Sequence, residues 1–190
     1  MNIFIVDTSI CNIQSLKSSL NFLGINYKVS NKKSELEKAT HIILPGVGSF
    51  DVAMKELENY DLLEILKYLA TSKKIPFLGI CLGMQLLFES SLEGSKSGLS
   101  IMKGKIKNLS NQKKLFKIPN IGFNKIINFK KEGIFTDFQS DPFFYFTHSY
   151  ALFDSIEGLN YAESIHDKNF ISAFQYQNIC ATQFHPEKSQ

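Results

Sequence analysis

One short stretch, Gly79-Ile80-Cys81-Leu82-Gly83, restricts the fold more than any other part of this sequence. The apolar residues 75–80 predict a buried strand before Cys81, and leucines at helical spacing follow it. Small flanking residues let the backbone turn sharply and present the side chain at the turn, which is the form of a nucleophile elbow. A thiol at the start of a helix also faces unpaired N–H groups that favour the thiolate. We therefore interpret Cys81 as a nucleophile, against the alternative of a buried small hydrophobe.

The last residues of the chain supply a candidate base for such a nucleophile. Gln183-Phe184-His185-Pro186-Glu187 places a histidine and a carboxylate on either side of a proline, which excludes a helix interior and favours extended chain. Side chains two residues apart on an extended chain point to one side, so Glu187 can orient His185 to take the thiol proton.

The first half of the chain alternates strand and helix patterns. Strands are expected at residues 2–6, 27–30, 41–44 and 75–80, with helices near residues 13–23, 34–39, 49–57, 62–69 and after Cys81. This alternation predicts an α/β fold, a three-layer sandwich with a mostly parallel central sheet. Ligands bind such sheets at the carboxyl ends of the strands, where Cys81 and the loop Pro45-Gly46-Val47-Gly48 both lie.

After residue 91 the pattern changes to short strands with turns between them. Residues 101–109 alternate lysine with apolar residues, and residues 108–114 form a polar turn. Strand-like runs follow at residues 143–147, 160–165, 170–175 and 179–184, which predicts an antiparallel extension of the same core. There is no sign of a linker or repeat, so residues 1–190 are expected to form a single domain.

Composition excludes several classes of function. A chain of 190 residues with 44% hydrophobic and 21% charged residues is typical of a globular domain, and a net charge of +3 does not indicate nucleic-acid binding. Three cysteines, at positions 11, 81 and 180, show neither metal-ligand spacing nor a disulfide framework. We expect a cytoplasmic protein without a metal, an organic cofactor or a membrane segment.

Motifs along nearly the whole chain resemble the triad-type (class I) glutamine amidotransferases, and among them the glutaminase subunits of imidazole glycerol phosphate synthase. The resemblance rests on LPGVGSF at 44–50, GICLGMQLLFESS at 79–91, GLSIMKG at 98–104, KIPNIGFN at 117–124, FYFTHSY at 144–150 and the terminal QFHPEKS. It implies glutamine hydrolysis by a Cys81–His185–Glu187 triad. It also implies transfer of the ammonia to a (β/α)₈ barrel cyclase, in a heterodimer that makes imidazole glycerol phosphate and an aminoimidazole carboxamide ribotide.

The resemblance also assigns roles to individual residues. It implies an oxyanion hole formed by N–H groups near Val47, Gly48 and Leu82, and a loop at 45–48 that adopts an inactive orientation in some family members. The substrate-binding residues that it implies are Gln85, His148, Ser149 and Tyr150. The residues that it implies for the interface with the cyclase are Asn12, Tyr145 and Lys188.

Three departures from the family pattern leave alternatives open. Asn120, Ile121 and Phe123 stand where the family usually has histidine, methionine and tryptophan, and Cys11 replaces a glycine. The chain also stops at Gln190, where family members continue into a final helix. The alternatives are a paralogue that feeds ammonia to another barrel, such as one modifying a nucleotide sugar, a catalytically silent regulatory subunit, and a free-standing thiol hydrolase.

Overall fold

The computed structural model describes residues 1–8, 13–109, 117–138 and 142–189. In the first half of the chain the elements are β1 (Ile3–Val6), α1 (Gln14–Phe22), β2 (Tyr27–Ser30), α2 (Lys33–Leu36), β3 (His41–Gly46), α3 (Phe50–Asn59), α4 (Leu63–Lys67), the π-helical turn η1 (Tyr68–Ser72), β4 (Phe77–Cys81) and α5 (Leu82–Gln85). The second half contains β5 (Ser90–Ser91), β6 (Lys105–Asn108), β7 (Asn120–Lys125), the 3₁₀ turn η2 (Gly133–Phe135), β8 (Phe143–His148), β9 (Tyr150–Ala151), β10 (Asn160–His166), β11 (Lys168–Tyr176), β12 (Ile179–Thr182) and the 3₁₀ turn η3 (Pro186–Lys188).

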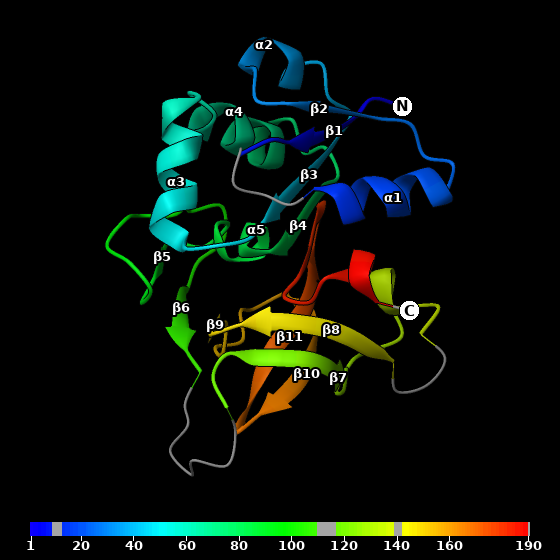
Figure 1. Cartoon of the computed structure of the whole chain (residues 1–190), viewed down its shortest axis with the longest axis vertical. Coiled ribbons are helices and arrows are strands. Elements are labelled where there is room, and N and C mark those ends of the chain that lie inside the picture. Colours follow the sequence, from blue (N-terminus) through cyan, green and yellow to red (C-terminus); the bar gives the residue numbers. More distant parts are fainter. Residues whose placement is uncertain (9–12, 110–116, 139–141, 190) are drawn as a thin grey trace.

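The central sheet has seven strands in the order β10-β11-β12-β4-β3-β1-β2. The strands from β12 to β2 are all parallel, and β10 and β11 extend the sheet in antiparallel pairing. The predicted α/β class with a mostly parallel sheet and an antiparallel extension is therefore confirmed. In Figure 1 the strands β1–β4 and helices α1–α4 fill the upper half of the molecule, and the later strands fill the lower half.

Alternate residues of the strands pack into different layers, as the two-residue period of a strand requires. On one face, Ile3 and Ile5 pack with Leu16 and Leu20 of α1. On the other face, Phe4 and Val6 join a larger core cluster with residues of α3, α4 and α5. Helical layers on both sides of the sheet bury the parallel strands and complete the three-layer sandwich.

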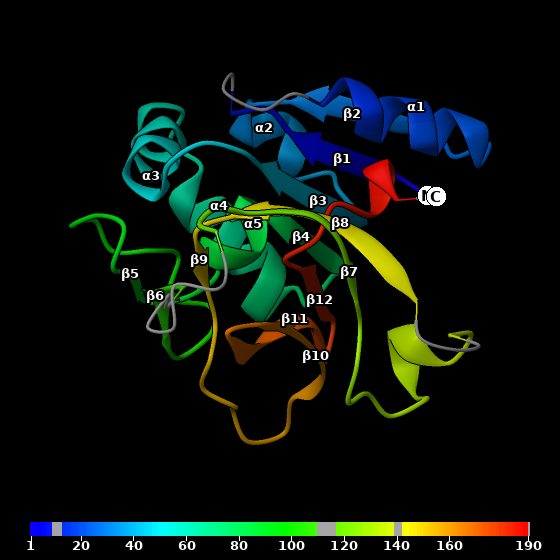
Figure 2. The same cartoon turned by 60° about the horizontal axis from the view of Figure 1, so that its bottom comes forward.

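The strand predicted at residues 143–147 is present as β8, but it does not belong to the central sheet. It pairs antiparallel with β7, which the sequence pattern did not reveal, in a separate two-stranded ribbon visible in Figures 1 and 2. A second aromatic core cluster, including Phe146 and Phe170, packs the ribbon against the antiparallel strands. Pairing is decided by this packing, which a strand pattern alone does not encode.

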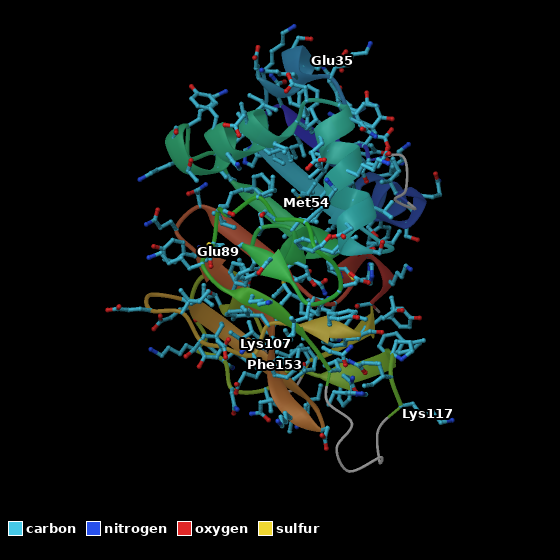
Figure 3. All side chains as sticks on the ribbon, turned by 90° about the vertical axis from the view of Figure 1, so that its left-hand side faces the viewer. Glu35, Met54, Glu89, Lys107, Lys117 and Phe153 are labelled. Atoms are coloured by element: carbon cyan, nitrogen blue, oxygen red, sulfur yellow. The ribbon has the colours of Figure 1, made fainter. Side chains whose placement is uncertain are left out.

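Other segments differ from expectation mainly in length. Only Lys105–Asn108 of the segment 101–109 is a strand, and most of the predicted turn at residues 108–114 lies outside the described residues. The helix after Cys81 covers only Leu82–Gln85. Figure 3 places Glu35 of α2 at one end of the long axis and Lys117, just before β7, toward the other. In Figure 1, β4 lies between the upper and lower halves of the molecule.

Candidate active site

Cys81 is the last residue of β4 and has a strained backbone, with φ +54° and ψ −109°. Such a conformation costs a non-glycine residue roughly 1–3 kcal/mol and persists only where the surroundings enforce it. The enforcement comes from close packing of glycines: a Cβ at Gly83 would overlap the carbonyl oxygen of Leu44, and one at Gly79 would lie 2.9 Å from the Gly83 oxygen. The turn predicted at Cys81 is therefore present.

His185 lies beside Cys81 because their strands are parallel neighbours. Thr182, the last residue of β12, is in register with Ile80, and the chain reaches His185 three residues later. The Nδ1 of His185 is 2.8 Å from Oε1 of Glu187, and both side chains are buried. The sequence predicts extended chain from His185 to Glu187, but the extended chain ends at His185. Pro186 begins the 3₁₀ turn η3, and Glu187 approaches the imidazole from that turn.

Opposing effects set the charge of the imidazole. Burial alone lowers the pKa of His185, but the neighbouring Cys81 sulfur and the Glu187 carboxylate outweigh it and raise the pKa to about 9. The buried Nε2 makes no hydrogen bond of regular geometry within the described part of the chain, although the sulfur is close enough to affect the pKa. At neutral pH the imidazolium form is therefore favoured, and it stabilises a thiolate beside it.

A cavity of about 270 Å³ opens above these residues, at the small end of the range for ligand pockets. It brings together most of the side chains expected from sequence: Val47, Gly48, Cys81, Leu82, Gln85, His148, Ser149, Tyr150 and His185 line it. Three further residues line it that the sequence did not suggest: Glu93, Pro119 and Thr147. Glu187 is not part of the lining, since it lies behind His185.

The loop after β3 borders the cavity next to Cys81. Gly46 pairs with Cys81 in the β3–β4 register, and Gly48 has φ +90°, a conformation that favours glycine. Val47 and Gly48 therefore lie on the same side of the pocket as Leu82 at the start of α5.

His148 is held as a neutral imidazole. Burial lowers its pKa to about 4. Its Nδ1–H donates to the Tyr150 carbonyl oxygen at 2.9 Å, and its Nε2 accepts from Asn120 Nδ2 at 3.0 Å. Because both ring nitrogens are engaged, the side chain is a packed structural group, and Asn120, one of the departures from the family pattern, is part of that packing.

Gln85 is committed to protein partners through its amide NH₂. Its Nε2 donates to the Tyr150 carbonyl oxygen and to Oε1 of Gln183, each at 2.9 Å. Gln183 in turn donates from Nε2 to the Cys81 sulfur at 3.7 Å. Gln183 lies in the terminal QFHPEKS motif, but nothing in the local sequence indicates that its side chain reaches a residue 102 positions away.

Glu93 lies on an irregular loop, which explains why periodicity gave no signal for it. Its Oε2 accepts from the Phe50 N–H at 2.8 Å, next to the loop 45–48. Asp51 holds the loop that carries Glu93, because its carboxylate accepts from the backbone N–H groups of Ser95 and Lys96 at 2.9–3.1 Å. These hydrogen bonds lower the pKa of Asp51. Phe50 and Asp51, in the first turn of α3, therefore fix the position of Glu93, whose carboxylate is the only one among the residues that line the cavity.

The predicted interface residues lie at the edge of this site, except Asn12, which is outside the described residues. Lys188 Nζ lies 5.8 Å from the centre of the Tyr145 ring. The backbone N–H of His185 donates to the backbone carbonyl oxygen of Tyr145. Phe123 of β7 contacts Tyr145 at a ring separation of 5.6 Å and, with Ile121, is more than half exposed. We call these four residues, Ile121, Phe123, Tyr145 and Lys188, the β7–β8 face.

A cysteine at a strained elbow, a histidine paired with a glutamate and a glycine loop are the parts of a site for acyl transfer to a thiol, and sequence comparison identifies the family. The family model described as "Glutamine amidotransferase class-I" matches residues 4–190, so the chain belongs to that family. The fold is shared with a crystal structure of a glutamine amidotransferase (17% identity, 97% of this chain and 90% of that one, TM-score 0.76). A second solved structure, a glutamine amidotransferase from Thermotoga maritima, has 20% identity over 98% of this chain and 76% of that one, with a TM-score of 0.64.

Curated relatives narrow the family further. Imidazole glycerol phosphate synthase subunit HisH of Leptospira interrogans is 38% identical over 97% of this chain and 92% of its own length. The subunit of the same name from Cyanophora paradoxa is 41% identical over 100% of this chain and 88% of its own length. Within the amidotransferases the chain thus belongs to the HisH group, the glutaminase subunits of imidazole glycerol phosphate synthase in histidine biosynthesis, as the sequence motifs predicted. Among the described residues, no helix is long and apolar enough to span a bilayer.

Proposed function

We propose that Cys81, His185 and Glu187 form the triad that hydrolyses glutamine to glutamate and ammonia. The observation that carries this proposal is the 2.8 Å His185–Glu187 pair, which adjoins a strained cysteine elbow and contributes to the raised pKa of His185. The Cys81 thiolate attacks the carboxamide carbon and forms a bond to sulfur, while the carbonyl electron pair moves onto oxygen. The His185 imidazolium then gives its proton to the departing nitrogen, and ammonia leaves.

The second half of the reaction reverses these roles. His185, now neutral, takes a proton from water, whose oxygen attacks the thioester; collapse releases glutamate and restores the thiolate–imidazolium pair. Backbone N–H groups at Val47, Gly48 and Leu82 are the proposed donors to the oxyanion in both halves. Removing one such donor typically costs about 10²–10³ in rate.

The cavity also suggests how the rest of the substrate is held. Glu93 offers a carboxylate to the α-ammonium group of glutamine, and the carbonyl oxygen of Gln85 is a second acceptor, because its NH₂ already serves Tyr150 and Gln183. Backbone groups of the segment 148–150 are the proposed partners of the α-carboxylate.

The ammonia is proposed to pass to a (β/α)₈ cyclase subunit in the cytoplasm, because ammonia released into water is protonated and lost as a nucleophile. The HisH relatives are named as subunits of a synthase, which implies a partner. The β7–β8 face is the proposed contact surface: it is aromatic and apolar, and the backbone of Tyr145 is bonded to His185. Aromatic residues are the commonest anchors in such interfaces. Asn12 is retained as a proposed contact from the sequence alone.

The test is glutamate release from glutamine by the purified chain, alone and with the cyclase of the same organism and its ribonucleotide substrate. We expect large stimulation in the mixture and its loss in Cys81→Ala, while Cys180→Ala, a half-buried cysteine away from the pocket, retains activity. Activity in Cys81→Ala would refute the triad. Equal activity with and without the cyclase would refute the partner and favour a free-standing hydrolase.

A further inference from the structure

Gln183 is a buried amide whose NH₂ group is directed at the sulfur of the nucleophile. It follows β12 directly and its side chain is fully buried. Its backbone N–H donates to the Ser172 oxygen at 2.8 Å, which fixes the residue to β11. Buried polar groups are almost always hydrogen-bonded, and here the two ends of the amide find Gln85 and the Cys81 sulfur.

The orientation of the two amides follows from one backbone carbonyl. The Tyr150 oxygen only accepts, so the end of Gln85 that faces it must be the NH₂ group. The same NH₂ lies 2.9 Å from Gln183, so Gln183 must present its oxygen there. The NH₂ of Gln183 therefore faces Cys81, at 3.7 Å from the sulfur. The reverse orientation would bring two NH₂ groups together and aim an oxygen at a thiolate.

We propose that Gln183 is a further catalytic residue, which donates a hydrogen bond to the Cys81 sulfur and favours its thiolate form, with Gln85 and the Tyr150 carbonyl as the groups that hold this orientation. The inference rests on the proposed function, because it assigns a role toward the nucleophile of that reaction. A hydrogen bond to the charged form of a group favours that form. In the thiol form the sulfur also has an acceptor, the Thr147 oxygen at 3.9 Å, so Gln183 shifts the balance between two available states.

Charged groups near the sulfur also affect the reactivity of Cys81, so their effect must be separated from that of Gln183. His185 is the one cation among the residues that line the cavity, with Glu187 behind it, and its pKa of about 9 keeps it mostly positive at pH 6, where the variants are compared, but not at pH 9. Glu93 contributes a negative charge from the opposite loop. His148 is neutral above pH 4, so it does not titrate in this range.

The experiment is the pH profile of alkylation of Cys81 by iodoacetamide, followed between pH 5 and pH 9 by quantifying the modified Cys81 peptide. Gln183→Met keeps the side-chain length but has no N–H donor. We expect it to react about tenfold more slowly than the wild type at pH 6, the factor that one pH unit represents, and at the same rate at pH 9. Gln85→Met should slow the reaction in the same direction, since it removes the group that orients Gln183.

Thr182→Val is the matched control. Thr182 is the adjacent buried residue, the last of β12, and its hydroxyl donates to the Phe184 carbonyl oxygen at 2.9 Å without a hydrogen bond to the sulfur. The control should lower the melting temperature and leave the alkylation profile unchanged. Gln183→Glu serves as a second variant of nearly identical shape; it places an oxygen against the sulfur and should slow the reaction at pH 6 at least as much as Gln183→Met.

The outcomes separate the inference from the function on which it rests. If Gln183→Met or Gln183→Glu folds and reacts as fast as the wild type at pH 6, Gln183 has no role toward the sulfur. An equal slowing in Thr182→Val would reduce the effect to general loosening and equally overturn the inference. Because alkylation needs no glutamine, a shifted profile in a chain that releases no glutamate with the cyclase would uphold the hydrogen bond and refute the glutaminase.

Discussion

At the scale of single residues, the site depends on a histidine whose charge is set by its neighbours. The pKa of His185 is about 9 in the folded chain, against 6.5 for an ordinary histidine. A raised pKa of this kind contributes stability that is fully present below pH 6.5 and is lost as pH rises through about 9. The same protonation supports the proposed reaction, so stability and activity are linked at this residue.

Glu187→Gln tests that link. The neutral amide removes the charge that favours the imidazolium, so the difference in melting temperature between wild type and variant should be greatest near pH 6 and shrink toward pH 9.5. Glutamate release with the cyclase should fall by about 10²–10⁴-fold, the usual contribution of an oriented acid–base group. Glu157→Gln, an exposed carboxylate, is the control and should change neither. A pH-independent difference would show that His185 is not charged in the folded chain.

The backbone of Cys81 makes a second prediction at this scale. Glycine in a strand normally costs about 0.5–1 kcal/mol relative to alanine, because it loses more conformational entropy on folding. At φ +54° the order should reverse, since glycine adopts this conformation without strain. We expect Cys81→Gly to be more stable than Cys81→Ala by about 1 kcal/mol in urea unfolding, with both inactive. Equal or lower stability of the glycine variant would mean that the elbow is unstrained.

At the scale of elements, the site depends on how closely α5 approaches β3. Gly83 is the second residue of α5, and a Cβ there would overlap the Leu44 carbonyl oxygen of β3 in the middle of the sheet. Neither partner can move easily, because Leu44 is paired with Gly79 of β4. The glycines of the motif are thus required by packing between elements as well as by the turn itself.

Gly83→Ala compared with Gly48→Ala separates close packing from backbone strain. Gly48 has φ +90° but open space around it, so its alanine variant should lose only about 1–2 kcal/mol of stability. Gly83→Ala should lose more, about 3 kcal/mol or above, since the helix must shift away from the strand. Urea unfolding of both variants measures this. Similar losses would mean that α5 can move without cost.

At the scale of the whole molecule, the β7–β8 face is exposed and lies beside the active site. Phe123, Ile121 and Tyr145 form an aromatic and apolar surface that the central sheet does not cover, and Lys188 connects it to η3. Singly exposed apolar residues are normal, whereas neighbouring exposed apolar residues are typical of interaction surfaces, and this face is the one that we propose for the cyclase.

Phe123→Ala should therefore weaken binding of the cyclase at least tenfold, as loss of a central aromatic anchor does, without changing the melting temperature. The measurement is titration calorimetry with the purified cyclase. Tyr68→Ala is the matched control, an aromatic residue of similar exposure on η1, outside the β7–β8 face, and should bind like the wild type. If Phe123→Ala binds normally, the partner docks elsewhere.

The sequence by itself determined the family and most of the parallel half. Residues flanking Cys81 specified the elbow, because glycine spacing reports directly on local backbone geometry. The alternation of strand and helix likewise specified a parallel sheet. The tertiary structure decided which distant groups meet: Gln85 and Gln183 are 98 positions apart, Glu93 enters the cavity from an irregular loop, and β8 leaves the main sheet to pair with β7. The physical reason is that sequence patterns record local preferences, whereas these contacts follow from packing between segments that no local pattern couples.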